Sequence, residues 1–475
     1  MAPTVAWKIS PRTTLTFEGS FLYDKRPIDR GLVALGTGVP DVPISRYLGP
    51  GTERNTFDEK RGYLYLDHRF SDSLSLRSAF RATKSIELRP LAVQAGNLRA
   101  NNRTVPLSSN AIDQLYETYT WQTDVVGKFS TGPIQHTLLF GVELNKIDGW
   151  NYNNFASTAR DVTTIDLFNP DYNRVRIPVL RPAPQNDRDY IVRLLGIYIQ
   201  NQIELLENLK LVVGGRYDGY RQDELRPSTP SLSDRQQGSA FSPRVGIVYQ
   251  PSKAVSLYAN YARSFQPQIG QSLDGEAFVP ERGTQYEVGI KVDLIRDRLS
   301  ATLAGYQITK SNVLTADPRN ANFSIQVGEQ RSQGIELDIT GEILPGWNVI
   351  ASYAYTDAEV RKDNRFPVGN RLINIPYNTA SLWTTYTLQT GRLKGLGVGA
   401  GVFFVDARSG DLANSFEVPS YARVDASIYY TTGGFRISLN VKNLFDTVYY
   451  AGTQNRSSIL PGAPFTVQGT ISYTF

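Results

Sequence analysis

Residues 435–442 read Phe-Arg-Ile-Ser-Leu-Asn-Val-Lys, an uninterrupted alternation of apolar and polar side chains. Successive side chains of a β-strand point to opposite faces of the sheet, so this alternation predicts a strand with one apolar and one polar face. Residues 285–294 and 209–218 repeat it, with Lys291 and Asp218 among the charged residues of the polar face. The same period runs along the whole chain and predicts an all-β protein.

The connections between the alternating segments differ in length in a regular way. Short turns are predicted at 10–12, 71–73, 130–133, 344–346 and 432–434, and long polar stretches include 27–59, 89–116 and 150–188. A soluble sandwich and a membrane barrel both contain alternating strands, but outer-membrane barrels also alternate short periplasmic turns with long extracellular loops. We therefore predict a transmembrane antiparallel β-barrel with long loops on one rim only.

The pattern predicts nineteen strands, at residues 4–9, 13–26, 60–71, 74–88, 117–130, 134–149, 189–205, 209–222, 240–250, 254–266, 284–295, 299–312, 331–343, 347–358, 378–388, 395–409, 420–431, 435–447 and 464–475. The first connection is a short turn, and short turns lie on the periplasmic side, so the first strand runs towards the periplasm. Counted from the start of an even-stranded barrel, a strand that runs in this direction has an even number. Three strands before Met1 would give about twenty-two, the size of the plugged outer-membrane transporters. The edge near Val5 and Trp7 should then be unpaired, or meet the last strand in an irregular seam.

The composition excludes several classes of protein. Among 475 residues there are no Cys, one Met and two His, whereas Tyr (27), Phe (21) and Gly (39) are abundant, which fits export through an oxidising compartment. The 50 Lys and Arg and the 45 Asp and Glu are scattered, so no basic stripe for nucleic acid forms. The sequence has no apolar run near the length of a transmembrane helix, which a barrel does not need.

Four segments carry a resemblance to a known family. They are RPIDRG at 26–31, PERGTQYEVGIK at 280–291, RSQGIEL at 331–337, and VKNLFD at 441–446 followed by Tyr449 and Tyr450. In this order they resemble the TonB-dependent siderophore receptors, the outer-membrane ferric-siderophore receptor family. The resemblance spans residues 26–475, although each segment alone indicates only a strand or a turn.

The resemblance implies a receptor in the bacterial outer membrane that imports ferric siderophores with energy delivered through TonB. Residues 1–475 would be its β-barrel domain, because no signal peptide, TonB box or plug is recognised, and Met1 would be an internal codon of a longer gene. Two alternatives remain open: a passive porin-like channel, and a TonB-dependent importer of another cargo such as cobalamin or oligosaccharide. The implied partners are a ferric siderophore, outer-membrane lipid, TonB and the barrel assembly machinery, whose recognition signal the aromatic terminus at Phe475 resembles; a monomer is expected.

Catalysis and direct metal binding are not expected. His68 and His136 are predicted near the periplasmic rim, away from the loops, and a lone His in a strand is usually structural. With no Cys and no His pair at ligand spacing, no catalytic or metal-ligating residue is assigned. The resemblance implies that iron arrives inside an organic chelate, so no cofactor of the protein's own is expected.

A chelate of this kind is bound by aromatic surfaces and hydrogen bonds, and by Arg where it is anionic. The candidate substrate-binding residues in the loops and upper strands are Trp150, Tyr152, Phe155, Tyr220, Arg263, Phe265 and Tyr355. An aromatic girdle at the outer interface accounts for many such residues without a ligand, so both interpretations stand. The identity of the cargo depends on the loops and is not predicted.

Overall fold

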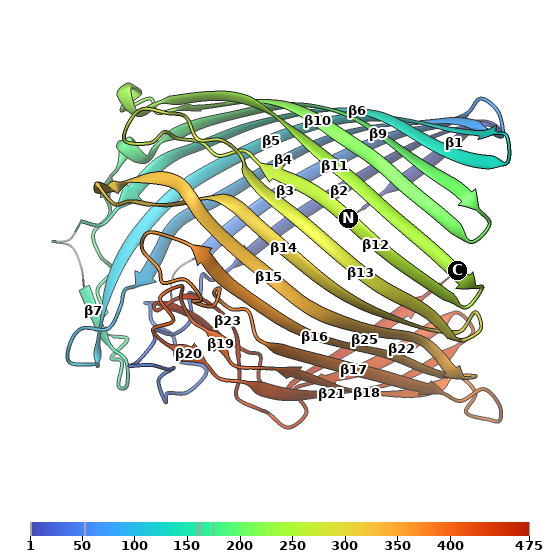
Figure 1. The fold of residues 1–475 in the computed structure, drawn as a ribbon. Coiled ribbons are helices and arrows are strands. Elements are labelled where there is room, and N and C mark those ends of the chain that lie inside the picture. Colours follow the sequence, from blue (N-terminus) through green and yellow to red (C-terminus); the bar gives the residue numbers. More distant parts are fainter. Residues whose placement is uncertain (1, 52–53, 159, 161–162, 174, 475) are drawn as a thin grey trace.

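The structure is a computed structural model that describes residues 2–51, 54–158, 160, 163–173 and 175–474. One sheet of 21 strands curls into a wide barrel (Figure 1). Nineteen strands form the wall, each antiparallel to the next: β1 (Thr4–Ser10), β2 (Thr13–Arg26), β3 (Arg54–Arg69), β4 (Leu74–Ala95), β5 (Thr104–Thr131), β6 (Ile134–Ala156), β9 (Arg188–Leu206), β10 (Leu209–Leu225), β11 (Asp234–Ser252), β12 (Val255–Gln266), β13 (Glu281–Ile295), β14 (Leu299–Asp317), β15 (Asn320–Leu344), β16 (Trp347–Lys362), β17 (Asn378–Thr387), β18 (Leu396–Val405), β21 (Tyr421–Thr432), β22 (Phe435–Lys442) and β25 (Thr466–Tyr473). The predicted all-β barrel and its nineteen strands are confirmed.

The remaining elements are small. They are β7 (Thr163–Asp166), β8 (Arg181–Pro182), β19 (Arg408–Ser409), β20 (Glu417–Val418), β23 (Tyr450–Asn455), β24 (Ser458–Pro461) and the 3-10 turns η1 (Pro184–Asn186) and η2 (Pro230–Leu232). Strand β7 pairs with the first residues of β5 and β8 with the last residues of β6, whereas β19–β20 and β23–β24 form two separate hairpin sheets. Within the described residues, no helix has the length and apolar character needed to cross a membrane.

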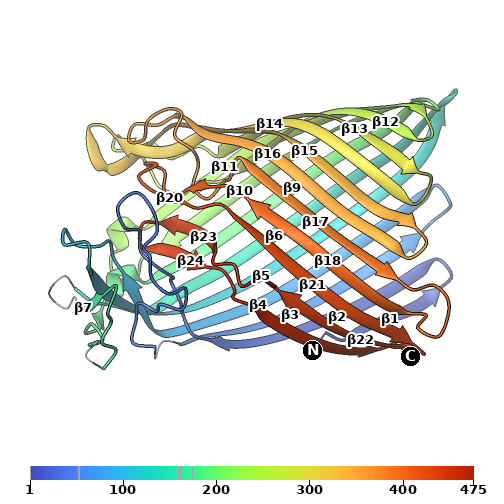
Figure 2. The same cartoon turned by 90° about the horizontal axis from the view of Figure 1, so that it is seen from below.

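The connections form two different rims (Figure 2). At the turn rim, on the right of Figure 2, strands are joined by as few as two residues, as at 11–12, 132–133 and 433–434. At the loop rim lie the long connections, including 27–53, 157–187 and 443–465. The predicted alternation of short turns and long loops along the chain is therefore confirmed.

Two of the predicted loops are largely strand. β4 continues to Ala95 and β5 begins at Thr104, within the stretch 89–116 predicted as a loop, and β14 and β15 are separated only by residues 318–319. Paired antiparallel backbones satisfy each other's hydrogen bonds wherever they lie, so a hairpin can extend beyond the membrane. There the side chains no longer divide between lipid and lumen, and the alternation that predicts a strand stops before the strand does.

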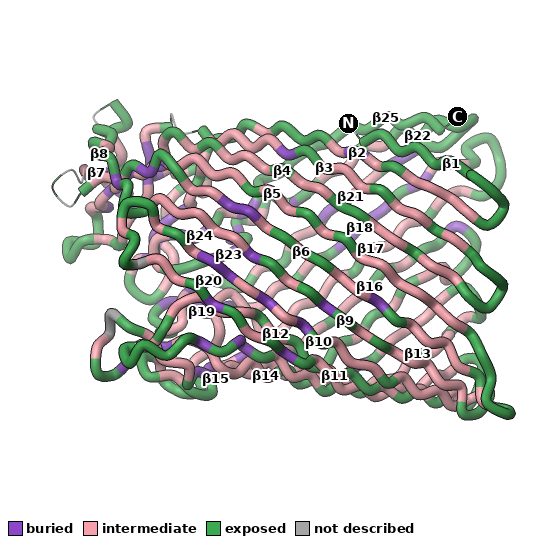
Figure 3. The backbone as a smooth tube through the Cα atoms, turned by 90° about the horizontal axis from the view of Figure 1, so that it is seen from above, coloured by how far each residue is buried: buried purple, intermediate pink, exposed green. Residues whose placement is uncertain are grey.

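The apolar face of the wall points outward. Leu195, Ile197 and Ile199 of β9 are exposed, whereas Gly196 between them is buried. Side chains diverge on the convex side of a curved sheet and converge on its concave side, so the more exposed set lies outside. Most of the remaining wall is exposed or half-buried (Figure 3). An exposed apolar belt of this kind is what a transmembrane barrel presents to lipid.

The strand quoted at the outset follows the same rule. Ile437 and Leu439 of β22 are about half exposed, at 52% and 45%. The guanidinium of Arg436 instead lies 4.3 Å from the ring of Tyr429 on β21, a contact between side chains that converge on the inner face. As predicted, Ile437 and Leu439 point outward, while Arg436 and, by alternation, Lys442 belong to the lumen face.

The sheet has two edges. Among the described residues β1 pairs only with β2, and β25 pairs only with β22. Every residue of both strands is exposed. The edge near Val5 and Trp7 is therefore without a strand partner in the part of the chain that the structure describes, as predicted.

The loops pack into a layer with its own apolar clusters. Leu32 and Val33, both fully buried in the connection 27–53, enter two different clusters. Val33 packs with Leu107 of β5, and Leu32 packs with Ile459 of β24 and exchanges two backbone hydrogen bonds with it, at 2.7 and 2.9 Å. Gly31 before them has φ +75°, and a Cβ there would lie 2.0 Å from the Ile459 carbonyl oxygen. The segment 26–31 thus helps to join the first and last loops of the chain.

Candidate binding site at the loop rim

The seven residues predicted to bind cargo fall into three groups. Trp150, Tyr152 and Phe155 lie at the loop end of β6, Tyr220 lies on β10 with Arg263 and Phe265 on β12, and Tyr355 lies on β16. Seven wall strands separate β6 from β16. The structure therefore does not gather the predicted set around one centre.

The β6 group belongs largely to the outer wall. Trp150 is opposite Leu115 of β5 and an even number of residues from the exposed Leu144, so it lies on the outer face. Tyr152 donates a hydrogen bond from its hydroxyl to the carboxylate of Asp189. Phe155 is partly exposed beside β8. Their positions fit an aromatic girdle.

The other predicted residues make local aromatic contacts. Tyr220, which is buried, stacks on Phe265 with ring centroids 6.1 Å apart, and Gly238 of β11 leaves the space for the Tyr220 ring. Arg263 lies 5.9 Å from the ring of Tyr261 on its own strand. Tyr355 stacks on Tyr377 at 6.2 Å, and this contact leads into the group described next.

A group of guanidinium and phenol side chains gathers where three late loops meet. This arginine–tyrosine cluster consists of Arg371, Tyr377, Arg408, Tyr421, Arg423, Tyr449 and Tyr450. Its members come from the connections 363–377, 406–420 and 443–465 and from the first residues of β21. Such groups bind anionic and aromatic ligands through charge-assisted hydrogen bonds and stacking.

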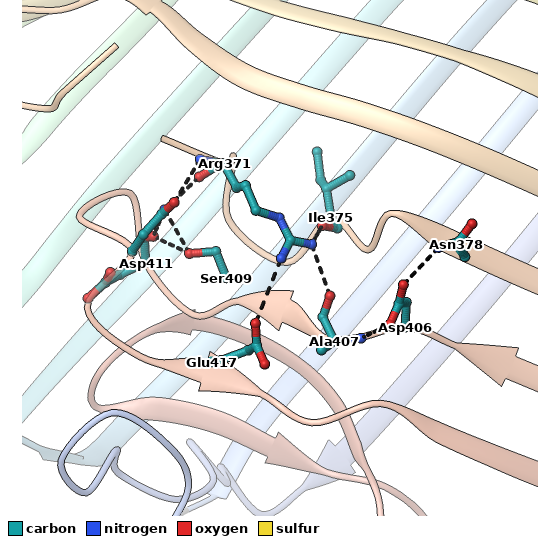
Figure 4. A network of polar contacts seen from close by, with 9 residues as sticks. Arg371, Ile375, Asn378, Asp406, Ala407, Ser409, Asp411 and Glu417 are labelled. Atoms are coloured by element: carbon teal, nitrogen blue, oxygen red, sulfur yellow. Dashed lines mark hydrogen bonds and ion pairs between the residues drawn. The ribbon is translucent and has the colours of Figure 1, made fainter. Parts of the chain in front are cut away.

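Arg371 links two of these loops (Figure 4). Its Nη2 donates hydrogen bonds to the carbonyl oxygens of Ile375, at 3.2 Å, and Ala407, at 2.9 Å. Its Nη1 lies 3.8 Å from the carboxylate of Glu417, and its guanidinium covers the ring of Tyr377 at 4.0 Å. A planar cation held by carbonyls, a carboxylate and a ring fixes the loops 363–377 and 406–420 together.

Arg408 is buried in the same group. Its Nη2 donates to the Tyr450 carbonyl oxygen at 2.6 Å, and its guanidinium lies 5.9 Å from the Tyr421 ring. No carboxylate among the described residues pairs with it, and its Nε has no hydrogen-bond partner there. Burial lowers the pKa of Arg408. The side chain nevertheless keeps its charge, since an arginine pKa starts above 12.

Arg423 faces the lumen from β21. It alternates with Ala422 and Val424, whose partners Phe404 and Val402 are exposed on the outer wall. Its Nε and Nη2 each lie 3.0 Å from a carboxylate oxygen of Asp425, and its Nη1 donates to the Tyr449 hydroxyl at 3.2 Å. Tyr421 stands on the same face and packs on Tyr449 with centroids 4.6 Å apart. The lumen side of the cluster thus presents a guanidinium between two phenols.

Asn443 fixes the loop that supplies Tyr449 and Tyr450. It is buried with φ +54°, in the left-handed region that Asn tolerates better than most residues. Its amide donates to the carbonyl oxygens of Thr447 and Ala463, at 2.9 and 3.0 Å, and its side-chain oxygen accepts from Thr447 N–H at 2.8 Å. Its backbone N–H donates to Asp425 at 2.8 Å. The structural role predicted for segment 443–446 is confirmed.

The sequence prediction missed the whole cluster except for its contact with Tyr355. Tyr449 and Tyr450 were recognised only as part of a family segment, and Arg408 and Arg423 resemble the many single arginines of other strands. The available signal was the pair Tyr421 and Arg423, which share a face at the start of a strand that follows a long loop. Nothing local to the sequence shows that three loops converge there.

A second ion-pair group fastens another loop. Arg319, between β14 and β15, donates two hydrogen bonds to Asp274 of the connection 267–280, at 3.0 and 2.7 Å, and its Nη2 lies 2.8 Å from Asp317. The hydrogen bonds from Arg319 lower the pKa of both carboxyl groups. The two carboxylates therefore hold the arginine over the neutral and mildly acidic range.

The ion-pair group of Arg319, Asp274 and Asp317 predicts that the stability of the loop 267–280 depends on pH. A lowered carboxyl pKa gives stabilisation that is present above the ordinary value near 4 and is lost as the pH falls through the lowered value. Protection from hydrogen exchange in residues 267–280, relative to the intrinsic exchange rate at each pH, should therefore stay high from pH 7 to about pH 5 and fall only below about pH 4, and Arg319→Gln should remove this dependence. An equal loss of protection in the two proteins on acidification would contradict the role of this ion-pair group.

The two histidines lie at the turn rim, as predicted. His68 Nδ1 is 2.9 Å from the Thr13 hydroxyl, and His136 Nε2 is 2.7 Å from the Thr131 hydroxyl. His136 Nδ1 also contacts the Asn201 amide at 3.0 Å. Among the described residues, no group of three His, Cys, Asp or Glu side chains is arranged to hold a metal ion.

The protein is a wide antiparallel barrel with an exposed apolar belt, short turns on one rim and packed loops on the other. These features define a transmembrane barrel of the bacterial outer membrane. The family described as TonB dependent receptor-like, beta-barrel matches residues 6–444. The chain belongs to this family.

Its relatives are transport receptors. The metal-pseudopaline receptor CntO of Pseudomonas aeruginosa is 34% identical over 483 residues, covering 100% of this chain and 68% of that protein. The ferrichrome outer membrane transporter/phage receptor of Escherichia coli is 30% identical over 100% of this chain and 67% of its own length. The crystal structure of the siderophore receptor PiuA from Acinetobacter baumannii shares the fold, with a TM-score of 0.88 and 23% identity over 99% of this chain and 73% of that one.

Proposed function

We propose that this protein binds and imports a metal ion wrapped in an organic chelator, as the ferric-siderophore receptors do, and that import depends on TonB. Relatives named for metal-pseudopaline, ferrichrome and ferrioxamine B support the class of cargo, while their variety leaves the individual chelate open. The observation that carries the proposal is the arginine–tyrosine cluster, which offers Arg423 and Tyr421 to the lumen at the loop rim.

The chemistry of the cluster suits an oxygen-rich, anionic chelate. A guanidinium forms paired hydrogen bonds with carboxylate-like oxygens, and a neighbouring phenol adds a stacking face and a donor. Asp425 already neutralises Arg423 in part, but the buried Arg408 has no such partner among the described residues. The field at the cluster should therefore attract negative charge, and the protein needs no metal ligand of its own because the chelator supplies them.

The test is binding and uptake of defined ferric chelates. Purified protein would be titrated with hydroxamate, catecholate and carboxylate ferric chelates. Uptake of labelled iron by the product of the complete gene, including any coding sequence before Met1, would be measured in an iron-limited host lacking other receptors, with and without TonB. We expect one chelate class to bind and to enter only in the TonB-containing strain. Failure of all three classes to bind, or uptake that is equal without TonB, would refute the proposal.

Removing the lumen-facing guanidinium should weaken this binding. Arg423→Gln is expected to reduce affinity for the bound chelate about tenfold or more, because a hydrogen bond to a charged group contributes about 1.5–3 kcal/mol. The matched control is Arg436→Gln, which removes a lumen-facing arginine at the turn rim. Unchanged affinity in Arg423→Gln, with loops still protected from protease, would place the cargo elsewhere.

A further inference from the structure

A second group of tyrosines and arginines lies on β3 and β4, below the loops. The two strands are neighbours in the wall (Figure 2). Tyr63 and Tyr65 of β3 stack with ring centroids 6.0 Å apart and planes 6° from parallel. Arg81 of β4 is opposite Tyr63, and the guanidinium of Arg77 lies 5.2 Å from the centre of the Tyr65 ring. These four residues form a lower arginine–tyrosine group with the same chemistry as the cluster at the loop rim.

The strand register places the lower group inside the barrel. Leu64 of β3 is opposite Phe80 of β4, and both are exposed. A chain of directly opposed residues on β5 and β6 connects Phe80 to the outward-facing Leu195 of β9, and opposed residues share a face of the sheet. Each member of the lower group lies an odd number of residues from Leu64 or Phe80 on its own strand. All four side chains therefore face the lumen.

A cavity continues from the lower group towards the turn rim. It has a volume of about 420 Å³, and its lining includes Arg77, Arg69 at the end of β3 and Arg12 of the first turn. Arg12 donates from its Nη1 to the carbonyl oxygen of Phe70 at 3.2 Å. At about 3.3 Å per residue and a tilt of about 45°, Arg77 and Arg81 stand about 7 and 16 Å above the start of β4. Arg81, Arg77, Arg69 and Arg12 thus form an arginine row that descends through the lumen.

Positive charge prevails along the arginine row. The acidic residues opposite members of the lower group are Glu18, Asp67 and Asp124, so four arginines and three carboxylates leave a net charge of +1. Asp67 lies 3.7 Å from Arg77, and Asp124 accepts a hydrogen bond from the Gln122 amide at 3.0 Å. No carboxylate of the described residues lies within 4.0 Å of the other three guanidiniums of the row. Their donors are available to an anion in the lumen.

We propose that the lower group is a second binding position for the metal chelate, which it occupies on its way from the loop rim to the turn rim. This inference rests on the proposed function. Anionic oxygens of the chelate accept hydrogen bonds from Arg81 and then from Arg77, while its planar parts lie on the rings of Tyr63 and Tyr65. Passage needs successive sites that bind strongly enough to accept the cargo and weakly enough to release it, and a wall that touches only one side of the cargo meets this need.

The test compares the rate of uptake with the affinity at the cell surface. The product of the complete gene, including any coding sequence before Met1, is expressed in an iron-limited host lacking other receptors. The probe is the hydroxamate, catecholate or carboxylate ferric chelate that the parent binds. Arg77→Gln with Arg81→Gln should lower the maximal rate of uptake at least fivefold, while the dissociation constant changes less than twofold. The corresponding double Lys variant, which keeps both charges, should retain at least half of the rate.

A matched control separates this role from a general effect on the barrel. Arg244→Gln removes a lumen-facing arginine of β11 that donates to the Gln200 side chain at 2.8 Å, and should change the rate less than twofold. Heat-modifiable migration in gels checks that each variant is folded. A parental rate in the folded double Gln variant, a loss of affinity as large as the loss of rate, or the same loss in Arg244→Gln would overturn the inference. Failure of the parent to bind any of the three chelates would instead refute the proposed function, and the inference with it.

A cysteine beside the lower group measures its occupancy directly. Thr16 of β2 is opposite Tyr65, and the 475 residues contain no Cys. Thr16→Cys should react with a charged thiol reagent at least threefold more slowly during import of the chelate, and only in the strain that contains TonB. Ser352→Cys, on the lumen face of β16, where Ser352 lies 2.7 Å from the Ser381 hydroxyl, should react equally fast with and without the chelate. Equal labelling of Thr16→Cys with and without the chelate in the TonB-containing strain would overturn the second binding position.

Discussion

Replacing Val288 by arginine is expected to destabilise the folded barrel by about 2–4 kcal/mol, the cost of Arg at the bilayer midplane on the lipid face of a barrel. Val288 of β13 is 61% exposed and is opposite Ala259 and Gly305 on the outer wall. A guanidinium there would have to lie in hydrocarbon or distort the bilayer to reach water. The free energy of unfolding in urea, measured on protein inserted into liposomes, gives the effect.

The control for this experiment is Gln285→Arg, three residues away on the lumen face. Gln285 donates to the Glu287 carboxylate at 2.9 Å, so an arginine at this position gains an ion pair in a wet interior. We expect its unfolding free energy to stay within about 1 kcal/mol of the parent, as for an exposed ion pair. If Gln285→Arg were the more harmful change, the assignment of the two faces would be wrong.

Replacing Asn443 by alanine is expected to release the loop 443–465 and, with it, one wall of the arginine–tyrosine cluster. The change removes three side-chain hydrogen bonds, and each buried group left unpaired costs about 1–3 kcal/mol. The backbone also loses a residue suited to φ +54°. Hydrogen exchange in this loop should accelerate by more than tenfold, and affinity for the ferric chelate should fall with it.

Two further variants divide this effect between its causes. Asn443→Gly restores the backbone freedom but not the hydrogen bonds, so it should recover only a small part of the loss. Asn440→Ala removes another Asn, on the lumen face of β22 three residues earlier, and should leave the loop protected. Slow exchange in the Asn443→Ala loop would show that Tyr449 and Tyr450 are held by other contacts, such as the packing of Tyr450 on Leu32 and Ile459.

Comparison of the predicted and observed strand ends shows which strand boundaries the sequence pattern alone determines. At the turn rim, where each strand reverses within a few residues, the predicted strand starts at 13, 74, 134, 209 and 435 agree with the structure to the residue. At the loop rim the errors are larger: β5 begins at Thr104 instead of 117, and β15 at Asn320 instead of 331. Turn residues carry their own conformational signal, whereas a hairpin outside the membrane loses the contrast between lipid and lumen that makes a strand visible.

The candidate binding residues show the same limit. Tyr220 and Phe265 were both identified from the sequence, and the structure stacks them, but Trp150 lies on the outer wall. An aromatic residue near the end of a strand can belong to the girdle or to the lumen. Its face follows from whether it lies an even or an odd number of residues from the outward-facing residues of the same strand. This count fails across a β-bulge, which inserts an extra residue, as between β5 and β6, where the register shifts between Ala111 and Asp113.

The sequence by itself determined the class of fold, the number of wall strands and the face that each central residue occupies, because a membrane imposes the same two-residue period on every strand. Only the tertiary structure decided which loops meet. No local sequence pattern links the segments that carry Arg371, Arg408 and Arg423. The loop 27–53 forms backbone hydrogen bonds with Ile459, more than 400 residues later. Such contacts follow from the curling of the wall into a barrel, which brings the ends of strands far apart in the sequence to one rim, and no periodicity within a single strand records that curvature.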